Sequence, residues 1–194
     1  MGRPSVFVRL SGCPLRCRWC DTAYAFHDGQ SYRLEDIEER VAAYGVQLVC
    51  LTGGEPLAQK SCRELVARLA TRGYTVSIET SGALDIGGLD PRVRIVMDVK
   101  APGSGESRRN RIENIGHLRE QDQVKFVLAD RTDYEWSRSF LREHTPGLRA
   151  EVLFSPVAGE LSPRALAEWV IEDRLPVRVQ IQLHKLLWGN VPGH

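Results

Sequence analysis

Residues 6–22 read VFVRLSGCPLRCRWCDT, and this segment carries the most specific pattern in the chain. The run from Val6 to Leu10 is β-branched, aromatic or aliphatic except at Arg9, which is typical of a strand. Directly after it, Cys13, Cys17 and Cys20 follow one another in the spacing C-x3-C-x2-C. We therefore expect a strand that ends in a short loop carrying three thiolates.

Three thiolates on one loop favour an iron–sulfur cluster that is open at one iron. They can hold three irons of a cubane, whereas four cysteines would close the cluster for electron transfer. An open position separates catalytic from structural zinc sites, and an open iron can likewise bind a ligand and act on it. The alternative is a structural zinc site with His27 as fourth ligand. Zinc modules usually pair two short knuckles, and the sequence has no second knuckle, so the spacing favours iron–sulfur.

The two remaining cysteines are expected to be core residues. Cys50 lies in an apolar strand-like run and Cys62 on an apolar helical stripe, settings in which a free cysteine behaves as a small hydrophobic residue. The total of five cysteines is odd, and three of them fall within eight residues, which indicates ligands rather than a disulfide framework.

The bulk composition is that of a globular protein without a nucleic-acid or membrane partner. The chain has 194 residues, 42% hydrophobic and 26% charged, and its formal net charge is +1. This length suits one domain over residues 1–194. No apolar run is long enough to span a bilayer, and the N-terminus lacks the apolar stretch of a signal peptide. We therefore expect a cytoplasmic protein whose thiols stay reduced.

Strand-like and helix-like runs alternate along the rest of the chain. Besides the first strand, further strands are expected at 47–51, 74–79, 93–99, 123–128, 151–154 and 177–183. Apolar residues at helical spacing predict helices over 34–42 and 62–70, and 110–119 is a further candidate helix. Two further helix starts are predicted, at a capping box formed by Thr132 and Glu135 and at Ser162-Pro163. This alternation implies α/β architecture, a partial (reduced) β/α barrel with about six parallel strands.

Unusual residues gather where the expected strands end. The motifs, in chain order, are Thr52-Gly53-Gly54-Glu55-Pro56, Glu79-Thr80-Ser81-Gly82, Asp98-Val99-Lys100, Ser155-Pro156 and His184-Lys185. Sites in parallel α/β folds lie at the C-terminal ends of the strands. We therefore expect these motifs to surround the cysteine loop, which spans 11–24.

The cysteine loop followed by Thr52-Gly53-Gly54-Glu55-Pro56 resembles the radical S-adenosylmethionine (SAM) superfamily. That resemblance implies a [4Fe-4S] cluster whose open iron chelates SAM. It also implies reductive cleavage of SAM to a 5′-deoxyadenosyl radical, which takes a hydrogen from the substrate. The Gly-Gly-Glu-Pro turn would line the SAM amino group, because glycine allows close backbone approach.

The resemblance narrows to the 7-carboxy-7-deazaguanine synthase family. Its blocks run in order from residue 6 to about 188, through the motifs above together with Lys125-Phe126-Val127, Phe154-Ser155-Pro156 and Gln182-Leu183-His184-Lys185. Membership would imply conversion of 6-carboxy-5,6,7,8-tetrahydropterin to 7-carboxy-7-deazaguanine with loss of ammonia, a step of queuosine biosynthesis. It would also imply a magnesium ion, a homodimer and an external electron donor such as flavodoxin.

The same resemblance assigns roles to individual residues. Cys13, Cys17 and Cys20 match the cluster ligands, and Thr22 matches a threonine that reaches magnesium. Arg9 matches an arginine that meets the substrate. An arginine suits a carboxylate because its planar fork can bond both oxygens.

Further residues match the walls of the family's pocket. The SAM side would be lined by Gly53, Gly54, Glu55, Ser81 and Lys100. The substrate side would include Gly54 and His184, the latter in a C-terminal segment that folds over the substrate. Taken singly, Glu55 and Glu79 could equally form structural ion pairs, Lys100 could be solvated, and His184 could be a core histidine.

The orientation of Arg9 follows from strand alternation. Val6, Val8 and Leu10 share one aliphatic face suited to packing under helices, so Phe7 and Arg9 are expected to point into the barrel beside the cluster. There Arg9 would need an anionic partner, either Glu79 in a structural role or the substrate carboxylate in a functional one.

Two regions depart from the family pattern. The family carries a segment before its first strand that includes a substrate-binding glutamine. This chain begins 12 residues before Cys13, so we expect the native segment to be missing or substrate to bind differently. The tail 188–194 matches nothing and has no assigned role.

Two competing functions remain open from the residues alone. Another small radical SAM enzyme, such as an activase that makes a glycyl radical on a partner protein, would share the cysteines and the Gly-Gly-Glu-Pro turn but gives no reason for Asp21-Thr22. A non-catalytic zinc-binding module would differ in colour, because an iron–sulfur cluster absorbs in the visible and zinc does not.

Overall fold

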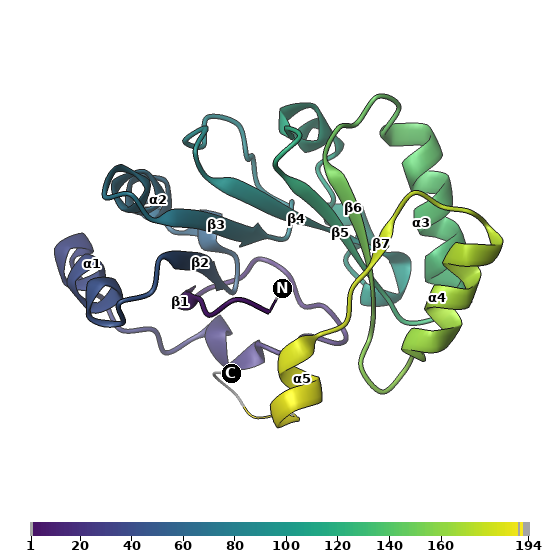
Figure 1. Ribbon diagram of the computed structural model, residues 1–194, viewed down its shortest axis with the longest axis horizontal. Helices are drawn as coiled ribbons and strands as arrows, with labels where there is room; N and C mark the ends of the chain where they lie inside the picture. The colour runs from purple at the N-terminus through teal and green to yellow at the C-terminus, as the bar shows by residue number, and fades with distance from the viewer. Residues whose placement is uncertain (1, 190, 192–194) are drawn as a thin grey trace.

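The computed structural model describes residues 2–189 and 191, and seven of their strands form one parallel sheet (Figure 1). The strands pair in chain order and all in parallel: β1 (Val6–Leu10), β2 (Leu48–Gly53), β3 (Thr75–Thr80), β4 (Arg94–Lys100), β5 (Gln123–Leu128), β6 (Glu151–Pro156) and β7 (Arg178–Val179). The α/β class is confirmed. The sheet has seven strands, one at each of the seven ranges expected from the sequence, and β1 and β7 are its two edges.

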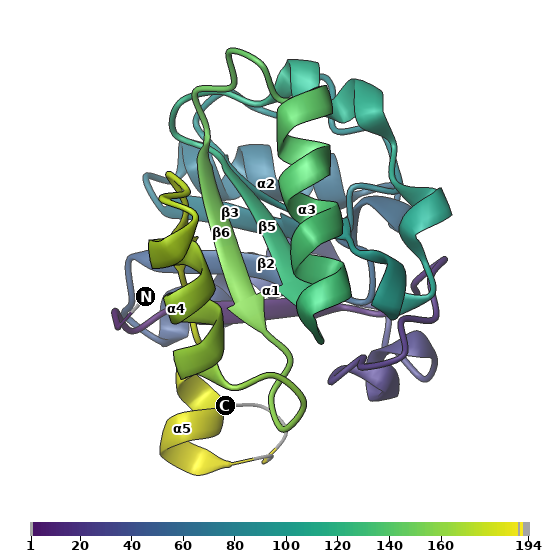
Figure 2. The same cartoon turned by 90° about the vertical axis from the view of Figure 1, so that its right-hand side faces the viewer.

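Helices cover one face of this curved sheet. The covering helices are α1 (Leu34–Ala43), α2 (Cys62–Thr71), α3 (Arg131–His144) and α4 (Pro163–Glu172). Figure 2 shows α3 and α4 lying across the β5 and β6 side. A short helix, α5 (Leu183–Trp188), lies instead on the concave side (Figure 1).

Within residues 2–189 and 191, five 3-10 segments occupy the connections. They are η1 (Ala23–Phe26), η2 (Pro56–Ala58), η3 (Pro102–Ser104), η4 (Ser107–Arg109) and η5 (Ile112–His117). The segment 110–119 was predicted as a helix, and the structure forms the 3-10 turns of η5 there instead. Among the described residues, no helix combines the length and apolar character that crossing a bilayer requires.

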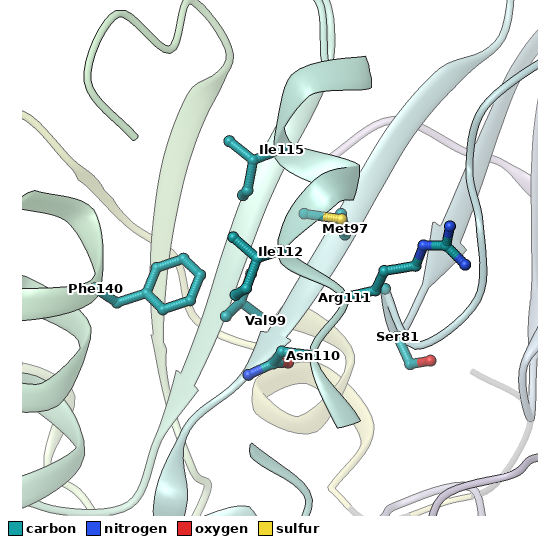
Figure 3. A pocket seen from close by; sticks show the side chains of 9 residues that line it. Ser81, Met97, Val99, Asn110, Arg111, Ile112, Ile115 and Phe140 are labelled. Atoms are coloured by element: carbon teal, nitrogen blue, oxygen red, sulfur yellow. The ribbon is translucent and has the colours of Figure 1, made fainter. Parts of the chain in front are cut away.

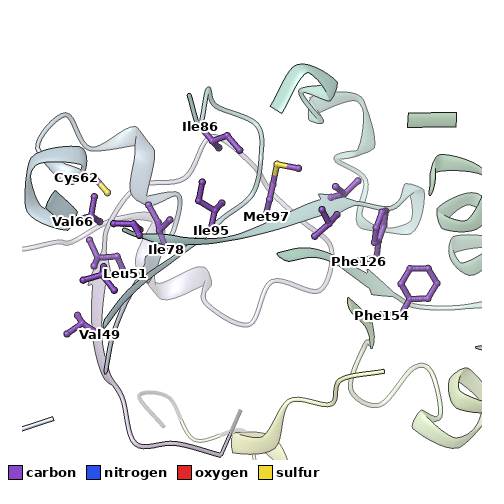
Figure 4. Packing of buried hydrophobic residues seen from close by; sticks show 14 of the residues in the cluster. Val49, Leu51, Cys62, Val66, Ile78, Ile86, Ile95, Met97, Phe126 and Phe154 are labelled. Atoms are coloured by element: carbon purple, nitrogen blue, oxygen red, sulfur yellow. The ribbon is translucent and has the colours of Figure 1, made fainter. Parts of the chain in front are cut away.

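Alternation along the strands separates an apolar face from a polar one. On β3, Val76, Ile78 and Thr80 are buried, whereas Glu79 is exposed. Val76 and Ile78 join one core cluster beneath the helices, and Figure 4 shows part of it. Val6 belongs to this core and Val8 and Leu10 pack against it, which confirms the aliphatic face of β1. The concave face keeps the polar side chains.

Helix starts were predicted with mixed success. Ser162 caps α4 and Pro163 is its first residue, as expected. The capping box at Thr132 was wrong: Asp130 caps α3, and its carboxylate accepts the backbone N–H of Asp133. Aspartate is a more favourable N-cap residue than threonine. Because α3 begins at Arg131, directly after Asp130, Thr132 lies inside the first turn.

The last predicted strand is much shorter than expected. Only Arg178 and Val179 pair with β6, and one more backbone bond joins Gln180 N–H to the carbonyl of Phe154. An edge strand has a neighbour on one side only, so the chain can leave the sheet early. It leaves here to form α5.

Candidate active site

The cysteine loop lies where β1 ends and is joined to the turn that follows β2. Gly54 N–H donates to the carbonyl of Leu10 at 2.9 Å, and Glu55 N–H donates to that of Gly12 at 2.8 Å. A Cβ on Gly54 would stand 2.1 Å from the Gly12 oxygen, so only glycine permits this approach. In the structure, Gly53 and Gly54 therefore allow the turn after β2 to pack against the backbone of the cysteine loop. The sequence suggested only that they allow a ligand to approach the backbone.

The three loop cysteines are free and partly exposed. Burial raises the pKa of Cys13, and the negative charges of Glu55 and Cys20 add to this while Lys100 opposes it. Burial also raises the pKa of Cys17, again against Lys100 and with contributions from Cys20 and Cys13. Cys20 thus contributes to the raised pKa of both Cys13 and Cys17, and Cys13 contributes to that of Cys17.

This donor set fits a cluster better than a single ion. Within residues 2–189 and 191, no three His, Cys, Asp or Glu side chains converge as one metal ion would require, so a preformed zinc site with His27 is not found. A cubane spreads its ligands farther apart than one ion does, and soft thiolates are the ligands that iron–sulfur clusters take.

Glu55 is fully buried under the glycine turn, with hydrogen bonds to both of its oxygens. Its carboxylate accepts the N–H of Leu57 at 3.0 Å, the hydroxyl of Thr80 at 2.9 Å and the N–H of Ser81 at 2.7 Å. The Ser81 hydroxyl also donates to it. The side chain thus ties the end of β3 to the turn after β2 and fixes the position of Ser81.

Lys100 lies beside the cysteines at the end of β4. Its Nζ is 2.9 Å from Asp98 Oδ2, and Asp98 together with Cys17 and Cys13 raises its pKa although burial opposes the charge. The other oxygen of this carboxylate, Asp98 Oδ1, is buried and accepts no hydrogen bond among the described residues. A buried acceptor of this kind calls for a further partner.

Arg9 and Thr22 meet at the other side of the loop. Arg9 Nη1 donates to Thr22 Oγ1 at 3.5 Å, and the Thr22 hydroxyl donates to Asp21 Oδ1 at 2.9 Å. The Arg9 guanidinium also lies 5.7 Å from the centre of the Tyr24 ring. Arg9 is exposed rather than buried, so its charge is not stranded.

Glu79 does not fill the role of a structural partner for Arg9. Its Oε2 accepts the hydroxyl of Thr52 at 3.5 Å, and no ion pair joins it to Arg9 in the described part of the chain. The Arg9 fork therefore remains available on the concave face.

His184 belongs to the C-terminal segment that crosses to the cysteine loop. Gln182 Nε2 donates to Asp21 Oδ2 at 2.8 Å, and Lys185 Nζ lies 3.7 Å from the same oxygen. Sequence reasoning missed this contact, because nothing local in Asp21 or Gln182 signals a partner about 160 residues away. The structure thus brings the segment carrying His184 to the loop that carries Thr22.

Two hollows lie away from this concave face. A small apolar cavity of about 10 Å³ lies on the helix side of β4, between Met97, Val99, Ile115 and Phe140 (Figure 3). A larger hollow of about 550 Å³ is lined by residues 112–119 and 144–149, the latter leading into the start of β6. It therefore lies at the end of the sheet opposite the cysteine loop and cannot serve it.

Comparisons with known proteins agree with this geometry. A family model described as the radical SAM superfamily matches residues 7–122. The 7-carboxy-7-deazaguanine synthase of Chlorobaculum tepidum is 42% identical over 191 residues, covering 97% of this chain and 87% of its own. The enzymes of that name from Koribacter versatilis and Thermoplasma acidophilum are 42% and 36% identical over 96% and 99% of this chain, and 89% and 91% of theirs.

Solved structures share the fold at lower identity. The crystal structure of QueE from Escherichia coli superposes with a TM-score of 0.75 at 22% identity, covering 93% of this chain and 86% of that one. Streptococcus suis SuiB gives a TM-score of 0.64 at 12% identity, over 92% of this chain and 49% of its own.

Proposed function

We propose, because the chain belongs to the radical SAM superfamily and within it to the 7-carboxy-7-deazaguanine synthase family, that it converts 6-carboxy-5,6,7,8-tetrahydropterin to 7-carboxy-7-deazaguanine with loss of ammonia. The observation that carries this proposal is identity of 42% with a synthase of that name over 97% of the chain. The reaction would serve the biosynthesis of queuosine and other 7-deazapurines.

Membership of the superfamily implies a [4Fe-4S] cluster and SAM. When bound, these two groups supply an electron and a 5′-deoxyadenosyl radical that abstracts hydrogen from the substrate. In our proposal Cys13, Cys17 and Cys20 hold the cluster. Their confinement to one loop at the end of β1 supports this assignment.

The SAM pocket is proposed to be lined by Gly53, Gly54, Ser81 and Lys100. Lys100 brings a positive charge beside the cysteines, which suits a carboxylate. Glu55 belongs to this group as a positioning residue, because its buried carboxylate orients the Ser81 backbone and hydroxyl instead of facing a ligand.

The substrate side is proposed to comprise Arg9, Thr22, Gly54 and His184. Arg9 would bond both oxygens of the pterin carboxylate through its fork. Thr22 would offer its hydroxyl oxygen to magnesium, a cation that prefers oxygen ligands and takes several of them from substrate and water. The hydrogen bond to Asp21 supports this role, because it engages the Thr22 proton and leaves Oγ1 as an acceptor, one lone pair of which accepts from Arg9 at 3.5 Å.

The assembly and partners follow the family as well. We propose a cytoplasmic homodimer that takes its electron from a carrier such as flavodoxin. Five free thiols agree with a reducing compartment. Light scattering of the loaded protein would test the dimer.

The decisive experiment is an anaerobic assay of the reconstituted protein with SAM, dithionite, magnesium and the carboxytetrahydropterin. We expect 7-carboxy-7-deazaguanine by mass spectrometry, and neither product nor visible absorption in Cys17→Ala. Formation of 5′-deoxyadenosine without any deazaguanine would reject the synthase and favour a radical SAM enzyme with another substrate.

A further inference from the structure

The residues between the three cysteines are held by parts of the chain far away in sequence. The backbone N–H of Arg16 donates to Glu106 Oε1 at 2.6 Å, and the backbone N–H of Arg18 donates to the carbonyl of Ser104 at 3.0 Å. Both partners lie in the connection after β4, about 90 residues downstream. The loop backbone is therefore anchored from outside on both sides of Cys17.

The Arg18 side chain adds a second attachment. Its Nε donates to the carbonyl of Gly103 at 3.1 Å, while Nη1 and Nη2 reach the two oxygens of Glu160 at 3.1 and 2.6 Å. A bidentate pair of this kind fixes direction as well as distance. Glu160 follows β6, so the loop is held from two separate strand ends.

The anchoring connection is itself rigid. Asp133, buried at the start of α3, accepts the N–H of Gly103 at 2.7 Å and that of Ala129 at 3.0 Å. The buried Ser104 hydroxyl donates to the carbonyl of Ala101 and accepts the N–H of Glu106 at 3.1 Å. The chain that meets Arg16 and Arg18 thus cannot shift freely.

We propose that Glu106 and Glu160 are positioning residues that hold the cysteine loop ready for the cluster before the cluster is present. Together with Arg18 and Ser104 they form what we call the loop clamp. The inference rests on the proposed assignment of Cys13, Cys17 and Cys20 as ligands. A loop that is ordered in advance does not have to be ordered when iron binds, which strengthens binding and slows loss.

The loop clamp joins the cluster site to two further strand ends, after β4 and β6. Ordinary surface ion pairs contribute little, and the Arg18 and Glu160 side chains are 53% and 37% exposed. We therefore expect little change in overall stability when the clamp is weakened, and a specific change in the loop. A local effect on the loop without a loss of overall stability would distinguish a positioning role from a merely structural one.

The test uses the metal-free protein first, because trypsin can cut after Arg16 and Arg18 only when the loop opens. Glu106→Ala and Glu160→Ala should raise the cleavage rate at these two arginines at least severalfold. Glu106→Gln should restore the parental rate, because the amide oxygen still accepts the Arg16 N–H. Glu168→Ala, which removes a surface pair within α4, is the matched control and should behave as the parent.

The second measurement is iron retention after reconstitution. Glu106→Ala and Glu160→Ala should lose iron to a chelator severalfold faster than the parent, with thermal midpoints unchanged within a few degrees. Parental cleavage and parental iron retention in both variants would overturn the proposal. If the parent itself takes up no cluster, the proposed function fails, and the tryptic comparison still decides whether the clamp holds the loop.

Discussion

The thiols of Cys50 and Cys62 differ from those of the cysteine loop in their surroundings. Burial raises the pKa of each to about 12, with neighbouring carboxylates adding to the effect. At pH 8 only roughly one in ten thousand of such thiols is ionised, and the thiolate is the reactive form. These two residues therefore provide an internal contrast to Cys13, Cys17 and Cys20.

We expect iodoacetamide to label the three loop cysteines of the native metal-free protein well before Cys50 and Cys62. The order should hold from pH 7 to 9, because both buried pKa values lie far above that window. Peptide mass spectrometry gives the order directly, and denatured protein serves as the five-thiol control. Early labelling of Cys50 would contradict the burial of its thiol.

The proposed role of Arg9 in binding the substrate carboxylate can be tested with a conservative replacement. Lysine keeps the charge but loses the fork, so Arg9→Lys should impair the enzyme along with Arg9→Ala. Since Arg9 is exposed, we expect a loss of about 2 kcal/mol in transition-state binding, roughly thirtyfold in kcat/KM. The measurement is steady-state kinetics with iron content as the control. Unchanged kinetics in both variants would remove Arg9 from the substrate site.

At the residue scale, the sequence predicted which residues belong to the candidate site better than it predicted what their side chains contact. The spacing of Cys13, Cys17 and Cys20 pointed to a common loop, and strand alternation placed Arg9 on the concave face. The burial of Glu55 beneath Ser81 could not be anticipated, because a carboxylate at a strand end looks the same whether it faces a ligand or four protein donors.

At the element scale, α1 and α2 are joined through one buried carboxylate. Glu38 on α1 is 1% exposed and pairs with Arg68 of α2 and with Arg72, the C-cap residue of that helix. Removing one partner of a buried pair costs more than the pair contributes, because the other charge loses its counterpart. Here Arg72 would lose its carboxylate, whereas Arg68 would keep Glu35 at 2.7 Å. Both arginines are partly exposed and can turn to water, so the cost is smaller than for a fully buried set.

We therefore expect Glu38→Ala to lower the free energy of unfolding by about 2–4 kcal/mol. Glu64→Ala is the matched control, since Glu64 faces the same Arg68 from an exposed position and should cost about 0.5 kcal/mol or less. Urea titration followed by circular dichroism measures both. Equal losses in the two variants would show that burial of Glu38 is not what matters.

Elements with strong periodicity were predicted well, and weakly periodic ones were not. The apolar stripe of α2 is buried against the sheet, and Leu34, Ile37 and Val41 of α1 pack there at helical spacing, so both patterns are visible in sequence. The segment 177–183 alternates in a strand-like way, yet pairing beyond Val179 has only one neighbouring strand to support it. The sequence of this segment does not show that β7 is an edge strand.

At the scale of the whole molecule, the sheet is an open arc. Its strands pair in order from β1 to β7, and no pairing between β1 and β7 is formed among the described residues. The alternation of runs predicted this parallel order, because each crossover returns the chain to the same end of the sheet. Side chains of the segment after β7 contact the loop after β1 across the open side of the arc. The alternation of strands and helices does not predict such side-chain contacts.

Asp21 is central to that bridge. The segment after β7 reaches the loop after β1 through Gln182 Nε2, 2.8 Å from Asp21 Oδ2, and through Lys185 Nζ at 3.7 Å. A hydrogen bond to a charged group contributes about 1.5–3 kcal/mol, and a partly exposed ion pair about 1 kcal/mol or less. Losing both should shift the docking equilibrium of the C-terminal segment by a factor on the order of 10–1,000.

We expect Asp21→Ala to increase hydrogen exchange in α5 and tryptic cleavage after Lys185, while α3 and α4 keep parental exchange. Asp21→Asn should fall between, because its amide oxygen still accepts from Gln182 but no longer attracts Lys185. Lys60→Ala, an exposed lysine before α2, is the matched control. If hydrogen exchange in α5 stays at the parental rate in Asp21→Ala, Asp21 does not hold the C-terminal segment. Apolar contacts would then keep this segment against the open side of the sheet.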